Sequence, residues 1–175
     1  AERSLEGLRV WEKNPVAKAF PDDLPDGELE KLFLSAARND AEAVQVLIRS
    51  QENWPDLEFH LDPLENREGN ILDDIEIGMV GYVMINYPSN YYRDFVTPFW
   101  RTKIPVGKIG SDGWTGWWAD PILPASSLDL EANTTRAAWI EVAVPEDAAH
   151  GMYRGTLQIR QKGKVIREIP LEMQV

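Results

Sequence analysis

Hydrophobic and polar residues alternate along several stretches of the chain, most clearly in "IEIGMVGYVMINYP" at 75–88. Every second position there carries an apolar side chain, except that Gly81 occupies one of them: Ile75, Ile77, Met79, Val83, Ile85 and Tyr87. A period of two over this length is typical of a β-strand with one buried face. We therefore predict a strand across this stretch.

Two further alternating runs lie near the C-terminus. The run "GMYRGTLQIRQ" at 151–161 alternates through Tyr153 and Ile159, and "VIREIPLEMQV" at 165–175 continues in the same way. Gly163 lies between them in "QKGK" and can adopt the positive φ that a tight hairpin turn requires. These runs are expected to form a β-hairpin.

The segment "NDAEAVQVLIRS" at 39–50 permits two interpretations. Asp40 could cap a helix, and the alanines that follow are good helix formers. The β-branched residues Val44, Val46 and Ile48 occupy alternating positions, however, and favour a strand. We predict a strand here, and others in "LEKLFLSAA", "DLEFHLDPL" and "AAWIEVAVPED", the last ended by a proline.

The alternation fails from Pro88 to about Arg136, which predicts one long loop rich in Trp, Pro and Gly. Strands separated by turn signals, without intervening long helices, indicate an all-β fold. We expect an antiparallel two-sheet β-sandwich of the immunoglobulin/fibronectin-like kind, and 175 residues suit one domain, 1–175. Because the last strand is still in register at Val175, we expect the domain to be cut from a longer protein.

Composition excludes some partners and chemistries. The net charge of -11 repels phosphate backbones and anionic lipid headgroups, so we expect no nucleic-acid partner. No apolar stretch is long enough to span a membrane, so no membrane insertion is expected. Without cysteine, the chain has neither a thiol nucleophile nor a thiolate metal site.

The long loop contains a tryptophan-rich stretch, "IGSDGWTGWWADPILP" at 109–124, in which Trp114, Trp117 and Trp118 precede Asp120. Three roles are open: an interface with a domain absent from this chain, a cover over one end of the sandwich, or a surface that stacks on a carbohydrate. The interface has the strongest physical support, because the prolines of "DPILP" stiffen the segment. Asp120 is expected to accept backbone or indole hydrogen bonds.

Other candidate chemistry is weaker. A glycosidase needs two carboxylates across a cleft, and the nearest to the tryptophans are Asp112, Asp120 and Glu141, but most carboxylates of so acidic a chain are surface charges. His60 and His150 are the only histidines and give no metal or nucleophile pattern. The acidic "PDDLPDGELE" lacks EF-hand spacing and indicates a solvated turn. We predict no catalytic residue, no metal site and no cofactor.

Three segments together resemble a known family. In order they are "LFLSAARNDAEAVQVLIRS", "GWWADPILP" and "AAWIEVAVPEDAAHGMYRGTLQI". They are similar to signatures of the N-terminal β-sandwich domain that precedes the catalytic barrel in glycoside hydrolase family 123 and in related proteins with uncharacterised barrels. Two mild departures occur: Asp40 stands where the family usually has Glu, and Ile122 replaces the first Leu of its Pro-Leu-Leu-Pro segment.

The resemblance implies a non-catalytic accessory domain that packs against a following catalytic barrel of the same chain. That barrel would cleave N-acetylgalactosaminides with help from the substrate's acetamido group, and its Asp-Glu pair would lie beyond Val175. The family further implies a protein that is secreted, on the cell surface or periplasmic. The alternative is a stand-alone carbohydrate-binding module that binds a glycan through the Trp114, Trp117 and Trp118 surface; a small self-sufficient glycosidase is a third, weaker alternative.

Overall fold

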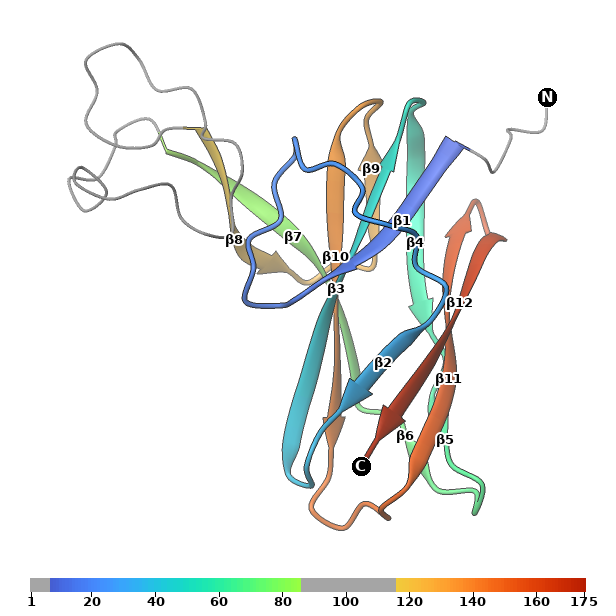
Figure 1. Cartoon of the computed structure of the whole chain (residues 1–175). Coiled ribbons are helices and arrows are strands. Elements are labelled where there is room, and N and C mark those ends of the chain that lie inside the picture. Colours follow the sequence, from blue (N-terminus) through green and yellow to red (C-terminus); the bar gives the residue numbers. More distant parts are fainter. Residues whose placement is uncertain (1–6, 86–115) are drawn as a thin grey trace.

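The computed structural model describes residues 7–85 and 116–175. These residues form strands, turns and loops without an α-helix, and the strands build two sheets that pack face to face (Figure 1). The expected all-β sandwich is confirmed. Within the described ranges, no helix long and apolar enough to cross a membrane occurs.

The first sheet contains five antiparallel strands, which we call sheet A. In spatial order they are β1 (Leu8–Lys13), β3 (Asp40–Ser50), β10 (Thr135–Val144), β7 (Ile75–Ile85) and β8 (Gly116–Leu123). The segment at 39–50 is thus a strand, as predicted. It lies between β1 and β10, which supply hydrogen-bond partners on both of its sides.

The second sheet, sheet B, faces the first. Its main path runs through β2 (Leu32–Ser35), β12 (Lys164–Gln174), β11 (Met152–Gln161), β4 (Trp54–Leu61) and β9 (Ser127–Leu130). The short strands β5 (Leu64–Glu65) and β6 (Ile71–Leu72) pair with each other, and β5 also pairs with β11. One pair departs from the antiparallel expectation, because β2 runs parallel to β12.

The predicted C-terminal hairpin is confirmed by β11 and β12. Lys162 and Gly163 connect the strands with φ values of 51° and 75°, as a two-residue turn of the primed type requires. Near the start of β11, the Tyr153 hydroxyl donates a hydrogen bond of 2.8 Å to the Ala149 carbonyl. This bond satisfies the polar end of an otherwise buried ring and ties the β10–β11 connection to the core.

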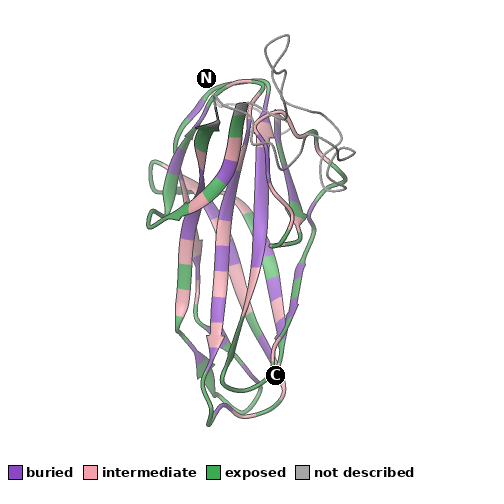
Figure 2. Ribbon diagram, turned by 90° about the vertical axis from the view of Figure 1, so that its left-hand side faces the viewer, coloured by how far each residue is buried: buried purple, intermediate pink, exposed green. Residues whose placement is uncertain are grey.

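The main core lies between the sheets and follows the alternation of the strands. Figure 2 shows buried and more exposed residues succeeding one another along the strands. Trp54, Phe59 and Tyr153 are among the largest fully buried side chains. The facing surfaces of the two sheets are buried against each other, and this burial is the main source of stability of the fold. The chain contains no disulfide, and its described residues form no metal site that could add to it.

A second, smaller core lies on the other side of sheet A. Its buried members are Trp11, Ala19, Leu47, Val80, Ala119 and Ala137. Residues 14–31, which we call the strap, connect β1 to β2 and contribute Ala19 and the fully buried Phe20. Gln45 of β3 holds the strap by donating hydrogen bonds to the carbonyls of Asn14 (2.9 Å) and Ala17 (2.7 Å).

The prediction of one long loop from Pro88 to Arg136 is wrong for its C-terminal part. That part contains β8, β9 and the start of β10. Gly116, Asp120 and Pro121 interrupt the apolar alternation of β8. A proline is tolerated there because β8 is an edge strand, where one missing N–H removes no hydrogen bond from a central ladder.

Candidate functional site

The tryptophan-rich stretch forms the edge strand β8, which pairs with β7. Figure 1 shows this pair leaning away from the remaining strands at the upper left of the view. Met84 is the partner of Trp117 in the ladder, and Val83 is the partner of Trp118. Close pairing requires a glycine in β7, because a Cβ on Gly81 would lie 2.9 Å from Cγ of Pro121. The edge strand is therefore held in place over its whole described length.

Trp118 packs against the strap. Its ring meets the Phe20 ring edge to face, with 5.4 Å between centroids and 77° between planes. Asp120, two positions later, points to the same side of a strand, and its Oδ1 lies 3.8 Å from Nζ of Lys18. These two residues link β8 to the segment that covers sheet A, which is a structural role.

Trp117 points to the opposite side of β8 and is 53% exposed. It therefore shares no surface with Trp118. Trp114 and Asp112 lie outside the described residues. Of the four predicted site residues, the structure brings Trp118 and Asp120 together on the strap and places Trp117 at the rim of a groove.

This groove, which we call the open-edge groove, lies where the edges of the two sheets face each other. Its walls come from β7, β8 and the start of β10 in sheet A, from β9 of sheet B, from the turn that leads into β10 and from Pro21 of the strap. Its volume is about 710 Å³, and its lining includes Tyr82, Trp117, Leu123, Leu128, Thr134 and Arg136. A concave site of this size and mixed chemistry can hold a small ligand.

Tyr82 and Arg136 form the polar floor of the open-edge groove. The Arg136 Cζ lies 5.5 Å from the centroid of the Tyr82 ring, a cation–π distance. Burial raises the pKa of the Tyr82 hydroxyl to about 12, against a smaller opposing effect of the Arg136 charge. The Tyr82 hydroxyl and the Arg136 Nε are buried and find no hydrogen-bond acceptor or donor in the described part of the chain.

Sequence reasoning missed this pair of residues. Tyr82 lies in the face of β7 that the alternation marks as outward, and Arg136 lies in the segment predicted as loop. The two residues are 54 positions apart in the chain. Only the pairing of β7 with β10 and the twist of β7 bring them together, so no local motif could have revealed them.

The remaining candidate carboxylates have structural partners. Glu141 Oε2 accepts a hydrogen bond of 3.3 Å from the Trp139 indole N–H. Asp129, which lines the open-edge groove, accepts a 2.8 Å bond from the Asp56 backbone N–H through its Oδ1. These contacts give Glu141 and Asp129 structural roles in positioning loops and strands.

His60 and Asp23 of the acidic turn also have structural partners. His60 Nε2 lies 3.1 Å from Oδ1 of Asp62, its near neighbour in the chain. Asp23 accepts hydrogen bonds from the Lys13 ammonium (2.7 Å) and the Phe20 backbone N–H (2.9 Å) through Oδ2, which fixes the turn in the strap. Among residues 7–85 and 116–175, no group of three His, Asp or Glu residues could hold a metal ion.

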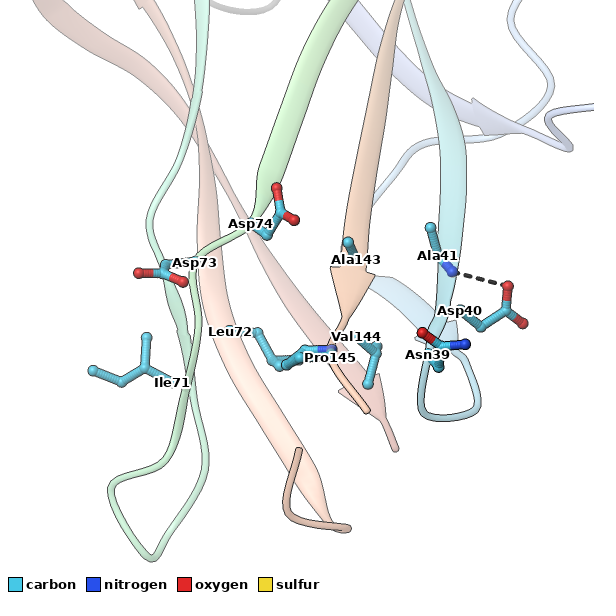
Figure 3. A pocket seen from close by; sticks show the side chains of 10 residues that line it. All are labelled: Asn39, Asp40, Ala41, Ile71, Leu72, Asp73, Asp74, Ala143, Val144 and Pro145. Carbon is cyan, nitrogen blue, oxygen red and sulfur yellow. Dashed lines mark hydrogen bonds between the residues drawn. The ribbon is translucent and has the colours of Figure 1, made fainter. Parts of the chain in front are cut away.

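A second groove lies at the opposite end of the sandwich, and we call it the end groove (Figure 3). Its volume is about 580 Å³, and it runs between the start of β3 and the β6–β7 connection. Leu72, Val144 and Pro145 give it an apolar lining, and Ile71 at its rim is 57% exposed.

Three carboxylates surround the apolar part of the end groove. Asp73 and Asp74 lie on one side and Asp40 on the other (Figure 3). The Asp40 Oδ1 accepts a hydrogen bond of 2.9 Å from the Ala41 backbone N–H. The C-terminal residue Val175 lies at this same end (Figure 1), where it exchanges two backbone hydrogen bonds of 3.0 Å with Gly151.

Comparison with known proteins identifies relatives of the fold. One solved structure, a family 123 glycoside hydrolase from Clostridium perfringens, superposes with a TM-score of 0.73 at 16% identity, covering 97% of this chain and 27% of that one. The chain thus spans about a quarter of that enzyme's length. Weaker matches are a PapD-like domain of human CEP192 (TM-score 0.38, 10% identity, 99% of this chain and 89% of that one) and the N-terminal domain of PorA (0.39, 7%, 95% and 96%).

No curated protein matches the chain. The model of the glycoside hydrolase 123 N-terminal domain, in contrast, matches residues 21–161. This match runs from the strap to the end of β11. It includes β2 to β11 and the lining of both grooves, while β1 and β12 lie outside it. The chain therefore belongs to the glycoside hydrolase 123 N-terminal domain family.

Proposed function

We propose that this domain is the non-catalytic N-terminal part of a hydrolase that acts on N-acetylgalactosaminides, and that it docks on a following catalytic barrel through the end groove. Family membership supports an accessory domain of a glycoside hydrolase. The end groove is the observation that carries the docking. Domain 1–175 is then one unit of a longer chain that works outside the cytoplasm or on the cell surface.

The end groove has the chemistry of an interdomain contact. Leu72 and Val144 in its lining are already buried, so the apolar area that a partner could cover comes from Ile71, which is 57% exposed, and from the exposed Pro145. The surrounding carboxylates favour a partner segment with an apolar anchor between Lys or Arg residues. A chain continuing past Val175 would leave the domain at the same end of the sandwich as this groove (Figure 1), which is compatible with a barrel placed there.

The absence of catalytic work in this domain is supported by what its carboxylates do. Asp120 lies beside Lys18, Glu141 accepts from Trp139, and Asp129 accepts from the Asp56 backbone. Retaining and inverting glycosidases alike require two carboxyl groups on either side of the scissile bond. In this proposal that pair belongs to the barrel.

The test compares unfolding of the 175-residue chain and of the longer parent chain, each with Ile71→Glu. We expect the substitution to change the free energy of unfolding of the 175-residue chain by less than about 0.5 kcal/mol, because Ile71 is exposed. In the parent chain, Ile71→Glu should make the sandwich and the barrel unfold in two separate transitions, because a fourth negative charge at the end groove opposes docking.

Val16→Glu is the matched control, because Val16 is 85% exposed and lies in the strap, away from the end groove. It should leave the unfolding of both chains unchanged. Equal effects of the two substitutions in the parent chain, or no effect of either, would contradict docking through the end groove.

A further inference from the structure

The open-edge groove combines an exposed indole with polar groups that have no structural task. Trp117 stands at its rim, half exposed, while its neighbour Trp118 packs on the strap. Arg136 forms no ion pair with the described carboxylates, although Asp129 and Glu131 line the same groove. The groove therefore places a half-exposed tryptophan and a guanidinium without a described ion-pair partner in one lining.

The buried polar atoms strengthen the case for a ligand. Buried donors and acceptors nearly always have a hydrogen-bond partner. The Tyr82 hydroxyl and the Arg136 Nε lack one within the described residues, and both side chains lie in the groove lining. A bound molecule with several hydroxyl groups, directly or through water, would supply such partners.

The remaining lining fits the same kind of ligand. Ser127 contributes a hydroxyl group, and the Thr134 hydroxyl, which donates to the Glu131 carbonyl (2.7 Å), can still accept a hydrogen bond. The edge strand β9 presents backbone N–H and C=O groups along one side. The volume of about 710 Å³ accommodates one or two sugar rings. An indole face stacks on the apolar face of a pyranose while polar groups around it bind the ring hydroxyls.

We propose that the open-edge groove binds a neutral pyranose unit of a glycan, stacked on Trp117 and hydrogen-bonded by Arg136. Neutral sugars are favoured over acidic ones because Asp129 and Glu131 line the groove and the chain carries a net charge of -11. The inference goes beyond the proposed function: it concerns the end of the sandwich opposite the end groove, and either can fail without the other.

The experiment titrates the 15N-labelled 175-residue chain with methyl β-galactopyranoside and methyl β-glucopyranoside, followed by NMR. At least one should produce saturable shifts at the Trp117 indole N–H and at the amides of Leu128 and Thr134, with a dissociation constant of about 1 mM. Methyl β-glucuronide, which carries a carboxylate, should bind at least about tenfold more weakly than the neutral sugar.

Variants separate the groove from other surfaces. Trp117→Ala and Arg136→Met should each weaken binding by about tenfold or more while the remaining amide spectrum stays that of a folded chain. Trp139→Ala is the control, because Trp139 is also partly exposed but does not line this groove, and it should bind as the unchanged protein does.

Three outcomes of the titration would overturn the inference. They are the absence of shifts at about 50 mM of both neutral sugars, binding that survives Trp117→Ala, and preference for the glucuronide. Covering of the Trp117 indole by the barrel in the parent chain, shown as loss of its solvent exchange without sugar, would also overturn it. The Ile71→Glu result bears on none of these.

Discussion

Tyr82 shows how a single side chain can be buried at a cost that the rest of the fold offsets. Its ring packs against the small core of sheet A and beneath the Arg136 guanidinium, but its hydroxyl is buried without a described hydrogen-bond partner. A buried hydroxyl without a partner loses its bonds to water and receives nothing in exchange. The Tyr82 hydroxyl lies in the lining of the open-edge groove, where a bound molecule could supply a partner.

Tyr82→Phe should leave the free energy of unfolding unchanged or raise it by up to about 1 kcal/mol, because it removes a buried polar atom that lacks a partner. Urea unfolding at pH 7 measures this. A loss of more than about 1 kcal/mol would show that the hydroxyl is hydrogen-bonded in the folded protein.

The same variant should change the response to alkali. Burial raises the pKa of Tyr82 to about 12, so folding favours the protonated hydroxyl. The contribution of the protonated hydroxyl to the free energy of unfolding is fully present below the unfolded-state pKa of about 10. As the pH rises from 10 to 12, the free energy of unfolding should fall by about 2 kcal/mol at most. Tyr82→Phe should lose correspondingly less stability over this interval, and parallel stability curves for the two proteins would contradict the assignment.

Truncation of Trp118 should lower the free energy of unfolding more than truncation of its neighbour Trp117. Trp118→Ala removes the edge-to-face contact with Phe20 and should lower the free energy of unfolding by about 2–3 kcal/mol. Trp117→Ala removes a half-exposed ring and should cost about 1 kcal/mol or less. Equal costs in thermal or urea unfolding would mean that Trp117 is covered in the folded chain.

Among the secondary-structure elements, β7 and β8 depend most on glycine. Gly78 faces Ile122, and Gly81 faces Pro121 and Leu123, so that a Cβ at either position would collide with the edge strand. The ladder shifts register between Val80 and Tyr82, opposite the "DP" of β8. This irregularity lets a strand that contains a proline follow β7 closely, and it turns Trp117 towards the groove.

Gly155 in sheet B is another position where close packing between strands leaves no room for a side chain. A Cβ there would overlap with Leu64 of β5 and lie 3.1 Å from the Asp62 carbonyl oxygen, which is backbone and cannot easily move. Gly155→Ala should therefore lower the free energy of unfolding by about 1–3 kcal/mol. Gly7→Ala is the control, since its Cβ would meet only the Ser50 hydroxyl at an ordinary 3.7 Å, and it should have little effect.

At the scale of the whole molecule, the end groove and the open-edge groove lie at opposite ends of the sandwich. The end groove lies at the end of the sandwich where the chain reaches Val175 (Figure 1), while the open-edge groove is lined by β7, β8 and β9. An 11-residue strand such as β3 spans about 35 Å, so the two surfaces are far enough apart to act independently.

Glycoside hydrolase activity should be found in the parent chain and not in the isolated 175-residue chain. Under the proposed function, the parent protein should hydrolyse an aryl N-acetylgalactosaminide, while the purified 175-residue chain should release no aryl alcohol above the uncatalysed rate. Hydrolysis by the 175-residue chain would contradict the non-catalytic assignment, and an inactive parent would contradict the assigned substrate class. Neither result depends on the sugar titration of the open-edge groove.

Local patterns in the sequence were enough to predict the sandwich and many of its strands. The alternation at 75–85 and at 151–174, the β-branched residues of β3, and the turn at Gly163 each depend on neighbours in the chain, and each is found as predicted. Edge strands were predicted less well, because Gly and Pro in β8 remove the alternation that marks a strand. The family signatures were likewise readable, since they are runs of adjacent residues.

The candidate sites depend on contacts between distant residues, and these have no local signature. Trp117 and Trp118 are adjacent and chemically identical, yet one packs on Phe20 and the other borders a groove, because a strand turns successive side chains to opposite sides. Tyr82 and Arg136 meet only after β7 pairs with β10. Sequence patterns thus established the strands and the family, whereas packing of the two sheets and the strap established which side chains are free to bind.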